Sequence, residues 1–164
     1  MRKLAGAFFL LICGWGGGFW SAARCRSRLN RLELLDSYLA CLSEELEYTA
    51  APLCRIAKEL ARRPAFVRFP FARRCADARE GEPFALVFAG AVQAFFSGAE
   101  AEAPAILAGQ LGVLPVSEQL AAIDRCRGRL QQLLEQKRAE TGRSAELCRR
   151  LGVLAGTAAA VLLW

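Results

Sequence analysis

Residues 32–48 read LELLDSYLACLSEELEY, and this stretch predicts the fold class of the chain. Its leucines recur at alternating spacings of three and four residues, which places them on one stripe of a helix that packs on its neighbours. The leucines of this stripe are Leu32, Leu35, Leu39, Leu42 and Leu46. No alternating strand pattern longer than a few residues occurs anywhere in the chain. The sequence therefore predicts an all-α fold, a helical bundle.

Prolines divide the part of the chain that follows the leucine stripe. Pro52 suits the first turn of a second helix, where its missing N–H costs nothing. A third short helix is expected over residues 72–79. Residues 83–96 read PFALVFAGAVQAFF and are apolar nearly all round. They are too few to span a bilayer, so this segment is predicted to be the central, buried helix of the bundle.

The last part of the middle region is expected to hold two more helices. A loop over residues 97–103 leads into a short helix over 104–112. Ser117 can cap the long helix that follows it. Gly142 is a candidate interruption of that helix.

Both ends of the chain are apolar and uncharged. Leu4 to Ala23 holds no ionisable acid or base, and the same is true of Leu151 to Trp164. A helix of about twenty residues spans the ~30 Å core of a bilayer. We therefore predict an N-terminal transmembrane anchor over residues 1–23, a helical bundle domain over 24–150 and a C-terminal transmembrane segment over 151–164. The shorter last segment has an alternative, a buried C-terminal core helix.

Tryptophans and arginines mark the edges of the two predicted anchors. All three tryptophans of the chain lie in the terminal segments, where an indole ring suits the membrane–water boundary. Arginines follow the first segment and precede the last, which places the middle in the cytoplasm. The predicted anchor residues are Trp15, Trp20, Trp164, Arg24, Arg26, Arg149 and Arg150. The alternative is a secretory signal peptide cleaved after Ala23, which would make the chain an exported helical binding protein.

The composition argues against catalysis and against nucleic acid. The net charge is +6, but the basic residues gather beside the apolar ends, which favours lipid headgroups as the anionic partner. The chain has no histidine, the usual general base and metal ligand. Its 7 cysteines include no C-x-x-C pair, which predicts free thiols. We expect no enzyme, no cofactor, no metal and no small-molecule substrate. A thiol enzyme, the remaining alternative, would show one exposed cysteine of low pKa.

Three stretches carry motifs whose order and spacing are informative. They are LELLDSYLACLSEELEYTAAPL (32–53), LGVLPVSEQLAAI (111–123) and LGVLAGTAAAVLL (151–163). The first ends in an acidic–aliphatic–x–Tyr turn before Pro-Leu, at Glu45, Leu46, Tyr48, Pro52 and Leu53. In this order the stretches resemble the stage III sporulation protein AB family of endospore-forming bacteria, from one end of the chain to the other.

The second stretch keeps only part of the pattern that this resemblance leads one to expect. The family pattern is Phe-Gly, then Leu-Gly, then Asp, then Gln. The chain keeps Leu111, Gly112 and Gln119. It departs with Leu107 and Ala108 in place of Phe-Gly, and with Pro115 in place of the Asp.

The resemblance implies a role in an export-like assembly between mother cell and forespore. It implies a mother-cell membrane location facing the forespore, with a cytoplasmic domain similar to that of the inner-membrane platform protein of type II secretion systems. The implied partners are an ATPase like stage III sporulation protein AA, other membrane proteins of the assembly, and membrane lipid. The chain is then expected to be a non-catalytic adaptor that couples the ATPase to membrane partners.

Six residues of the two motifs are candidates for partner contact. They are Glu45, Tyr48, Pro52, Leu111, Gly112 and Gln119. Each also has an intramolecular alternative. Tyr48 and Gly112 can close helix ends, and Gln119 can stabilise a helix start.

Overall fold

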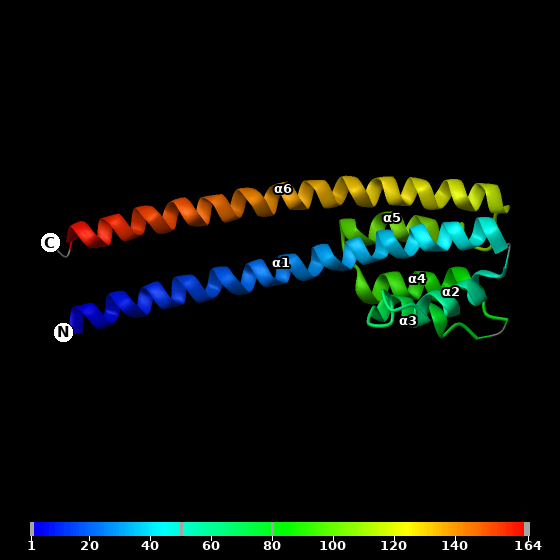
Figure 1. The fold of residues 1–164 in the computed structure, drawn as a ribbon, viewed down its shortest axis with the longest axis horizontal. Helices are drawn as coiled ribbons and strands as arrows, with labels where there is room; N and C mark the ends of the chain where they lie inside the picture. The colour runs from blue at the N-terminus through cyan, green and yellow to red at the C-terminus, as the bar shows by residue number, and fades with distance from the viewer. Residues whose placement is uncertain (1, 50, 80, 163–164) are drawn as a thin grey trace. The chain divides into compact units, whose positions relative to one another are not determined.

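The computed structural model describes the backbone of residues 2–49, 51–79 and 81–162, and the side chains of residues 26–49, 51–79 and 81–140. Over these residues the chain forms six α-helices and no strand, so the all-α prediction is confirmed. The helices are α1 (Arg2–Thr49), α2 (Leu53–Arg62), α3 (Pro70–Ala76), α4 (Phe84–Phe95), α5 (Ala99–Ala108) and α6 (Val116–Leu162) (Figure 1).

The chain divides into two compact units. One comprises Met1–Asn30 and Glu135–Trp164, which contain the outer parts of α1 and α6. The other is Arg31–Leu134, which we call the helical unit. It holds the inner parts of α1 and α6 together with α2, α3, α4 and α5. The predicted domain boundaries after residues 23 and 150 fall within α1 and α6 and stay predictions.

The leucine stripe of α1 forms one wall of the core of the helical unit. Its five leucines are 0–4% exposed, so the predicted packing face is confirmed. Asp36 lies beside this stripe, and its carboxylate accepts a hydrogen bond from the Arg127 guanidinium of α6 at 3.1 Å. In the view of Figure 1, the inner part of α1 therefore lies between α6 and the group of α2, α3 and α4.

Aromatic rings fill the middle of the helical unit. Phe71 of α3 is fully buried, and its ring contacts those of Tyr38, Phe69, Phe88 and Phe96 at centroid separations of 5.3–5.7 Å. Most of these rings meet edge to face, the arrangement that the ring quadrupole favours. We call this group, together with Phe66, the aromatic centre. It ties α1 to α3, α4 and the turn before α3.

The predicted burial of the helix over residues 83–96 is wrong in detail. α4 is not buried all round: Phe84, Phe88, Ala91 and Val92 are buried, whereas Leu86 is 65% exposed. α4 packs on α3 and α5, and the side that carries Leu86 is left open to solvent. An apolar sequence allows a helix to be buried on every side, but the number and position of the neighbouring helices determine which sides are buried.

The helix predicted over residues 104–112 begins earlier than expected. α5 starts at Ala99 and carries Pro104 in its interior. Alanines are strong helix formers, and Glu100 and Glu102 in the first turn favour a helix N-terminus electrostatically. These preferences outweigh the proline. The predicted loop over 97–103 is thus largely helical.

α3 and α6 also differ from the expected boundaries. α3 covers Pro70–Ala76, so it starts two residues before the predicted helix over 72–79 and ends three residues before it. α6 runs through Gly142 without a break, because a single glycine lowers helix stability without ending the helix. α1 is likewise continuous from the first apolar segment to the leucine stripe.

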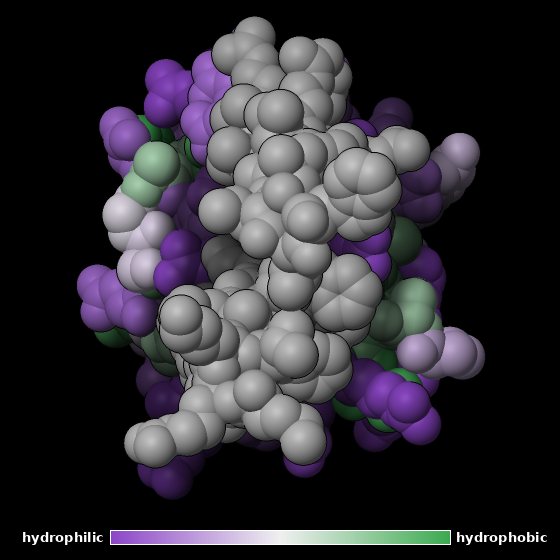
Figure 2. All heavy atoms as spheres, turned by 90° about the vertical axis from the view of Figure 1, so that its left-hand side faces the viewer, coloured by the Kyte–Doolittle hydropathy of each residue, from purple (hydrophilic) through white to green (hydrophobic). Residues whose placement is uncertain are grey.

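The predicted membrane segments are described by their backbone alone. The side chains of Trp15, Trp20, Arg24, Arg149 and Arg150 lie outside the described residues, as does Trp164, whereas Arg26 is exposed. Among the described residues, no helix combines the length and the apolar composition needed to cross a membrane. Most described residues on the face in Figure 2 are hydrophilic, with hydrophobic ones scattered among them.

Candidate functional site

The two predicted motifs of the helical unit meet at one end of it. A Cβ added to Gly112 would lie 3.8 Å from Cδ1 of Leu53, so the α5–α6 loop rests on the start of α2. Gly112 has a φ of +76°, a left-handed conformation that side chains other than glycine rarely adopt. We call this region the tip: residues 45–49, 51–53 and 109–119.

Gln119 holds the α5–α6 loop in place from the first turn of α6. Its side-chain oxygen accepts a hydrogen bond from the N–H of Gly112 at 3.2 Å. Its side-chain nitrogen donates to the carbonyl of Leu114. Gln119 is 6% exposed, so this amide is one of the few polar groups buried in the helical unit. Both hydrogen bonds of this side chain lie within the fold, and a contact of Gln119 with a partner stays a prediction.

α6 begins two residues earlier than a Ser117 cap would require, at Val116. The carbonyl of Pro115 accepts the N–H groups of Glu118 and Gln119, both at 3.0 Å. Pro115 therefore occupies the N-cap position and Ser117 lies inside the first turn, so the predicted cap is wrong. Proline has no side-chain oxygen to cap the free N–H groups of this turn.

Glu45 is paired within the fold. Its carboxylate accepts a hydrogen bond from the Arg63 guanidinium just after α2, and the two form an ion pair. The side chains of Glu45 and Arg63 are 25% and 42% exposed, so the pair lies at the surface. The pair connects the last turn of α1 to the residue that follows α2. Leu111 is buried in the core, with 1% of its surface exposed.

Apolar side chains at the tip remain open to solvent. Tyr48 is 87% exposed at the end of α1, and Val113 is 72% exposed directly after Gly112. Pro52, which accepts the first backbone hydrogen bonds of α2, is exposed between them in sequence. Of the six predicted contact residues, Tyr48 and Pro52 are thus available to a partner. Gly112 contributes its backbone, while the other three serve packing or polar bonds.

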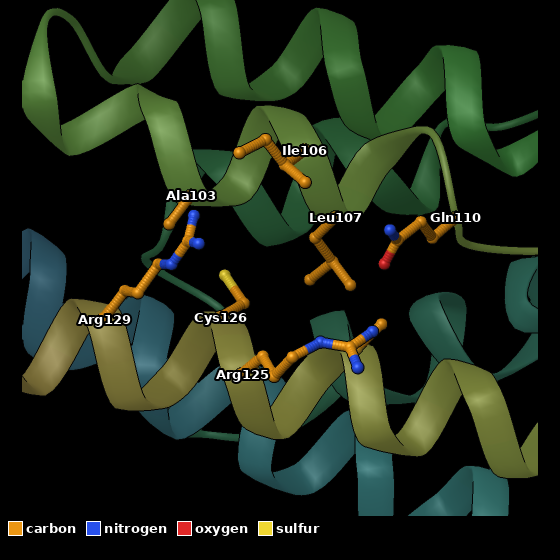
Figure 3. A pocket seen from close by; sticks show the side chains of 8 residues that line it. Ala103, Ile106, Leu107, Gln110, Arg125, Cys126 and Arg129 are labelled. Carbon is orange, nitrogen blue, oxygen red and sulfur yellow. The ribbon is translucent and has the colours of Figure 1, made fainter.

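Val113 was not among the residues predicted from the sequence. The sequence shows only that it follows a glycine in a loop, and this does not indicate whether the side chain is exposed. A second missed feature lies between α5 and α6, where side chains from both helices line a hollow of about 60 Å³. Arg125 and Arg129 flank the hollow, with Leu107 and Cys126 between them (Figure 3).

The two buried thiols of the helical unit have high pKa values. Burial raises the pKa of Cys75 to about 12, although an interaction with Tyr38 acts in the opposite sense. Burial also raises the pKa of Cys126 to about 12; the charge of Arg129 opposes this shift and that of Asp36 adds to it. A thiol with such a pKa is protonated at neutral pH and is a poor nucleophile. The described residues contain no group of three or more potential metal ligands.

The whole sequence was compared with models of known protein families. The model of the family described as stage III sporulation protein AB (spore_III_AB) matches residues 3–164. The chain belongs to this family. It is therefore a sporulation-related protein, and the resemblance inferred from the three motifs is confirmed. No curated protein and no solved structure matches the chain.

Family membership gives the tip its context. The end of the first motif and the start of the second lie in the tip of this stage III sporulation protein AB family member. Of the departures from the family pattern, Pro115 lies in the tip and Leu107 and Ala108 lie just before it, at the end of α5. Leu107 and Ala108 are both buried where α5 ends, so an apolar pair still packs there. Pro115 leaves the start of α6 without a side-chain cap, whereas Gln119 keeps its hydrogen bonds to the loop.

Proposed function

We propose that this chain is a membrane-anchored, non-catalytic platform or adaptor subunit of a secretion-like complex between mother cell and forespore. In this role it couples a cytoplasmic ATPase, of the kind of stage III sporulation protein AA, to membrane partners during endospore formation. The helical unit faces the mother-cell cytoplasm.

The exposed apolar surface of the tip is the observation that carries this proposal. Tyr48 and Val113 are 87% and 72% exposed, yet both adjoin backbone that is firmly held. The Glu45–Arg63 ion pair links the last turn of α1 to the residue after α2, and the buried Gln119 amide holds the loop that carries Val113. Exposed tyrosine on a rigid support is typical of protein interfaces, because little side-chain entropy is lost on binding.

The sequence supports the membrane location. The segments 4–23 and 151–164 contain no Asp, Glu, Lys or Arg, while all 16 acidic residues lie between them. Arginines flank both segments on the side of the helical unit, and this side is cytoplasmic under the positive-inside rule. Two weak anchors act together, since each tethers the other to the same bilayer.

Binding of the full-length chain to the ATPase tests the adaptor role. We expect the wild-type chain to retain the ATPase in a pull-down from detergent, and Tyr48→Ala to reduce the retained amount severalfold. Leu86→Ala is the matched control, because Leu86 is a 65% exposed apolar residue of α4 and is not one of the tip residues. Equal retention by Tyr48→Ala and wild type would contradict the proposed contact, and no retention by wild type would contradict the coupling itself.

Membrane attachment is tested separately from ATPase binding. We expect the full-length chain to stay with membrane vesicles during alkaline carbonate washing. Its intact mass should show a start at Met1 or Arg2. A mature chain that begins near Arg24 would instead establish the exported form with a cleaved signal peptide.

A further inference from the structure

The hollow between α5 and α6 combines an apolar floor with a basic rim. Ala103, Leu107, Ala122 and Cys126 form its apolar part. Figure 3 shows Arg129 reaching up beside Ala103, while Arg125 extends along α6 below Leu107 towards the side on which Gln110 lies. The rim thus offers two guanidinium groups and one amide to whatever enters the hollow.

The arginines of α6 fall into two kinds. Arg127 points towards α1 and forms an ion pair with Asp36 at 3.1 Å. Arg125 and Arg129 are exposed at the hollow, and neither takes part in the ion pairs found among the described residues. Two like charges four residues apart on a helix repel each other, which costs a few tenths of a kcal/mol. An anionic group placed between them would remove that repulsion and gain charge-assisted hydrogen bonds.

The size of the hollow limits what it can hold. Its volume is about 60 Å³. Sites for small molecules and cofactors usually measure roughly 300–1,000 Å³. The hollow therefore suits a single functional group rather than a whole nucleotide or metabolite. A carboxylate fits the chemistry of the rim, because its two oxygens match the fork of a guanidinium.

The hollow is continuous with the tip. Gln110, at its rim, accepts the backbone N–H of Val113 through its own carbonyl, so the exposed valine and the basic rim lie at neighbouring positions of one loop. A protein that covers Val113 from the α5 side will also meet Gln110 and Arg125. The partner of the tip is thus the natural source of the anionic group.

We propose that the ATPase that docks on the tip inserts an Asp or Glu side chain into the α5–α6 hollow, where Arg125, Arg129 and Gln110 bind its carboxylate. This inference rests on the proposed function and adds a specific, charged contact to it. The tip supplies apolar area, and the hollow fixes the register of the partner along α6. Charged contacts of this kind contribute mainly to specificity and to the rate of association.

Charge reversal of the rim tests the inference in the full-length chain. We expect Arg125→Glu/Arg129→Glu to raise the dissociation constant for the ATPase by about 10- to 100-fold, as loss of a charge-assisted contact does. Arg73→Glu/Arg74→Glu on α3 is the control, since both residues are exposed and the net charge changes equally. Arg125→Lys/Arg129→Lys should fall between wild type and the reversal, because it keeps the charge but loses the fork. Circular dichroism checks that all variants stay helical.

A zero-length cross-link identifies the carboxylate. In Arg125→Lys/Arg129→Lys, a carbodiimide should couple an introduced lysine to an Asp or Glu of the bound ATPase, which mass spectrometry then locates. If wild type binds the ATPase but the rim reversal binds equally well, this inference is wrong while the adaptor role stands. If the α3 control weakens binding as much as the rim reversal, the attraction is general and the inference is also wrong. If wild type does not bind at all, the proposed function fails and the inference with it.

Discussion

The aromatic centre and the tip belong to the same helical unit but are stabilised by different interactions. In the centre, packed rings from α1, α3 and α4 exclude water. At the tip, one buried amide, that of Gln119, holds a loop by two hydrogen bonds to its backbone. The comparison teaches that apolar packing in the centre stabilises the fold, whereas a few polar contacts at the tip are enough to hold a defined loop at the surface.

The largest effect should follow from emptying the centre. Phe71→Ala removes a fully buried ring that contacts four others, and we expect it to lower the free energy of unfolding by about 3–5 kcal/mol. Urea unfolding of the full-length chain in detergent measures this. Tyr48→Ala, an aromatic truncation at the exposed tip, should stay within about 0.5 kcal/mol of wild type. Similar losses for the two variants would abolish the distinction between the regions.

The free energy of unfolding should depend on pH through the Cys75 thiol, which is buried near the aromatic centre away from water. Burial raises the pKa of Cys75 from 9.0 to about 12. Below pH 9 the thiol is protonated in both the folded and the unfolded chain, so it adds no pH dependence. Between pH 9 and 12 the unfolded chain loses this proton while the folded chain keeps it, and stability falls as pH rises.

Removing the thiol isolates its contribution. Between pH 9 and 12, Cys75→Ala should lose stability less steeply than wild type, by about 1.4 kcal/mol for each pH unit. Urea unfolding at a series of pH values under reducing conditions gives both slopes. Other titrating groups, Cys126 and Tyr38 included, contribute to both chains. Parallel slopes would mean that water reaches Cys75 in the folded state.

At the tip, the loss of one amide should have a smaller and more local effect. Gln119→Leu keeps the volume of the side chain but leaves the N–H of Gly112 and the carbonyl of Leu114 without their partner. We expect a loss of about 1–2 kcal/mol, since water reaches part of this loop. Gln132→Leu, an exposed change on the same helix, is the control. Amide hydrogen exchange should accelerate at Gly112, and unchanged exchange there would contradict the assigned role of Gln119.

The sequence predicts what depends on short-range periodicity. The stripe from Leu32 to Leu46 repeats every three or four residues, and that repeat alone identifies a helix and its buried face. The resemblance of the motifs pointed to the tip. Burial of α4 could not be predicted in this way, because Leu86 is exposed only for want of a neighbour.

Polar contacts of the site were less predictable for the same reason. Glu45 and Arg63 are 18 residues apart in sequence, and their pairing depends on the angle between α1 and α2. Gln119 bonds to Gly112, seven residues earlier in the chain, across a loop in which that glycine takes a positive φ. The α5–α6 hollow requires two helices to be packed before it exists. Neither propensity nor charge pattern encodes such geometry.

The smallest predicted effect concerns the position where this chain departs from the family pattern. Pro115 caps α6 through its carbonyl alone, whereas an aspartate there would also accept an N–H of the first turn through its side chain. We compare Pro115→Asp with Pro115→Ala, because both lose the rigidity of proline equally. The aspartate variant should be more stable by about 1 kcal/mol in urea unfolding. Equal stabilities would mean that the two hydrogen bonds of Gln119 already order this helix start, so that the tip tolerates the loss of its cap.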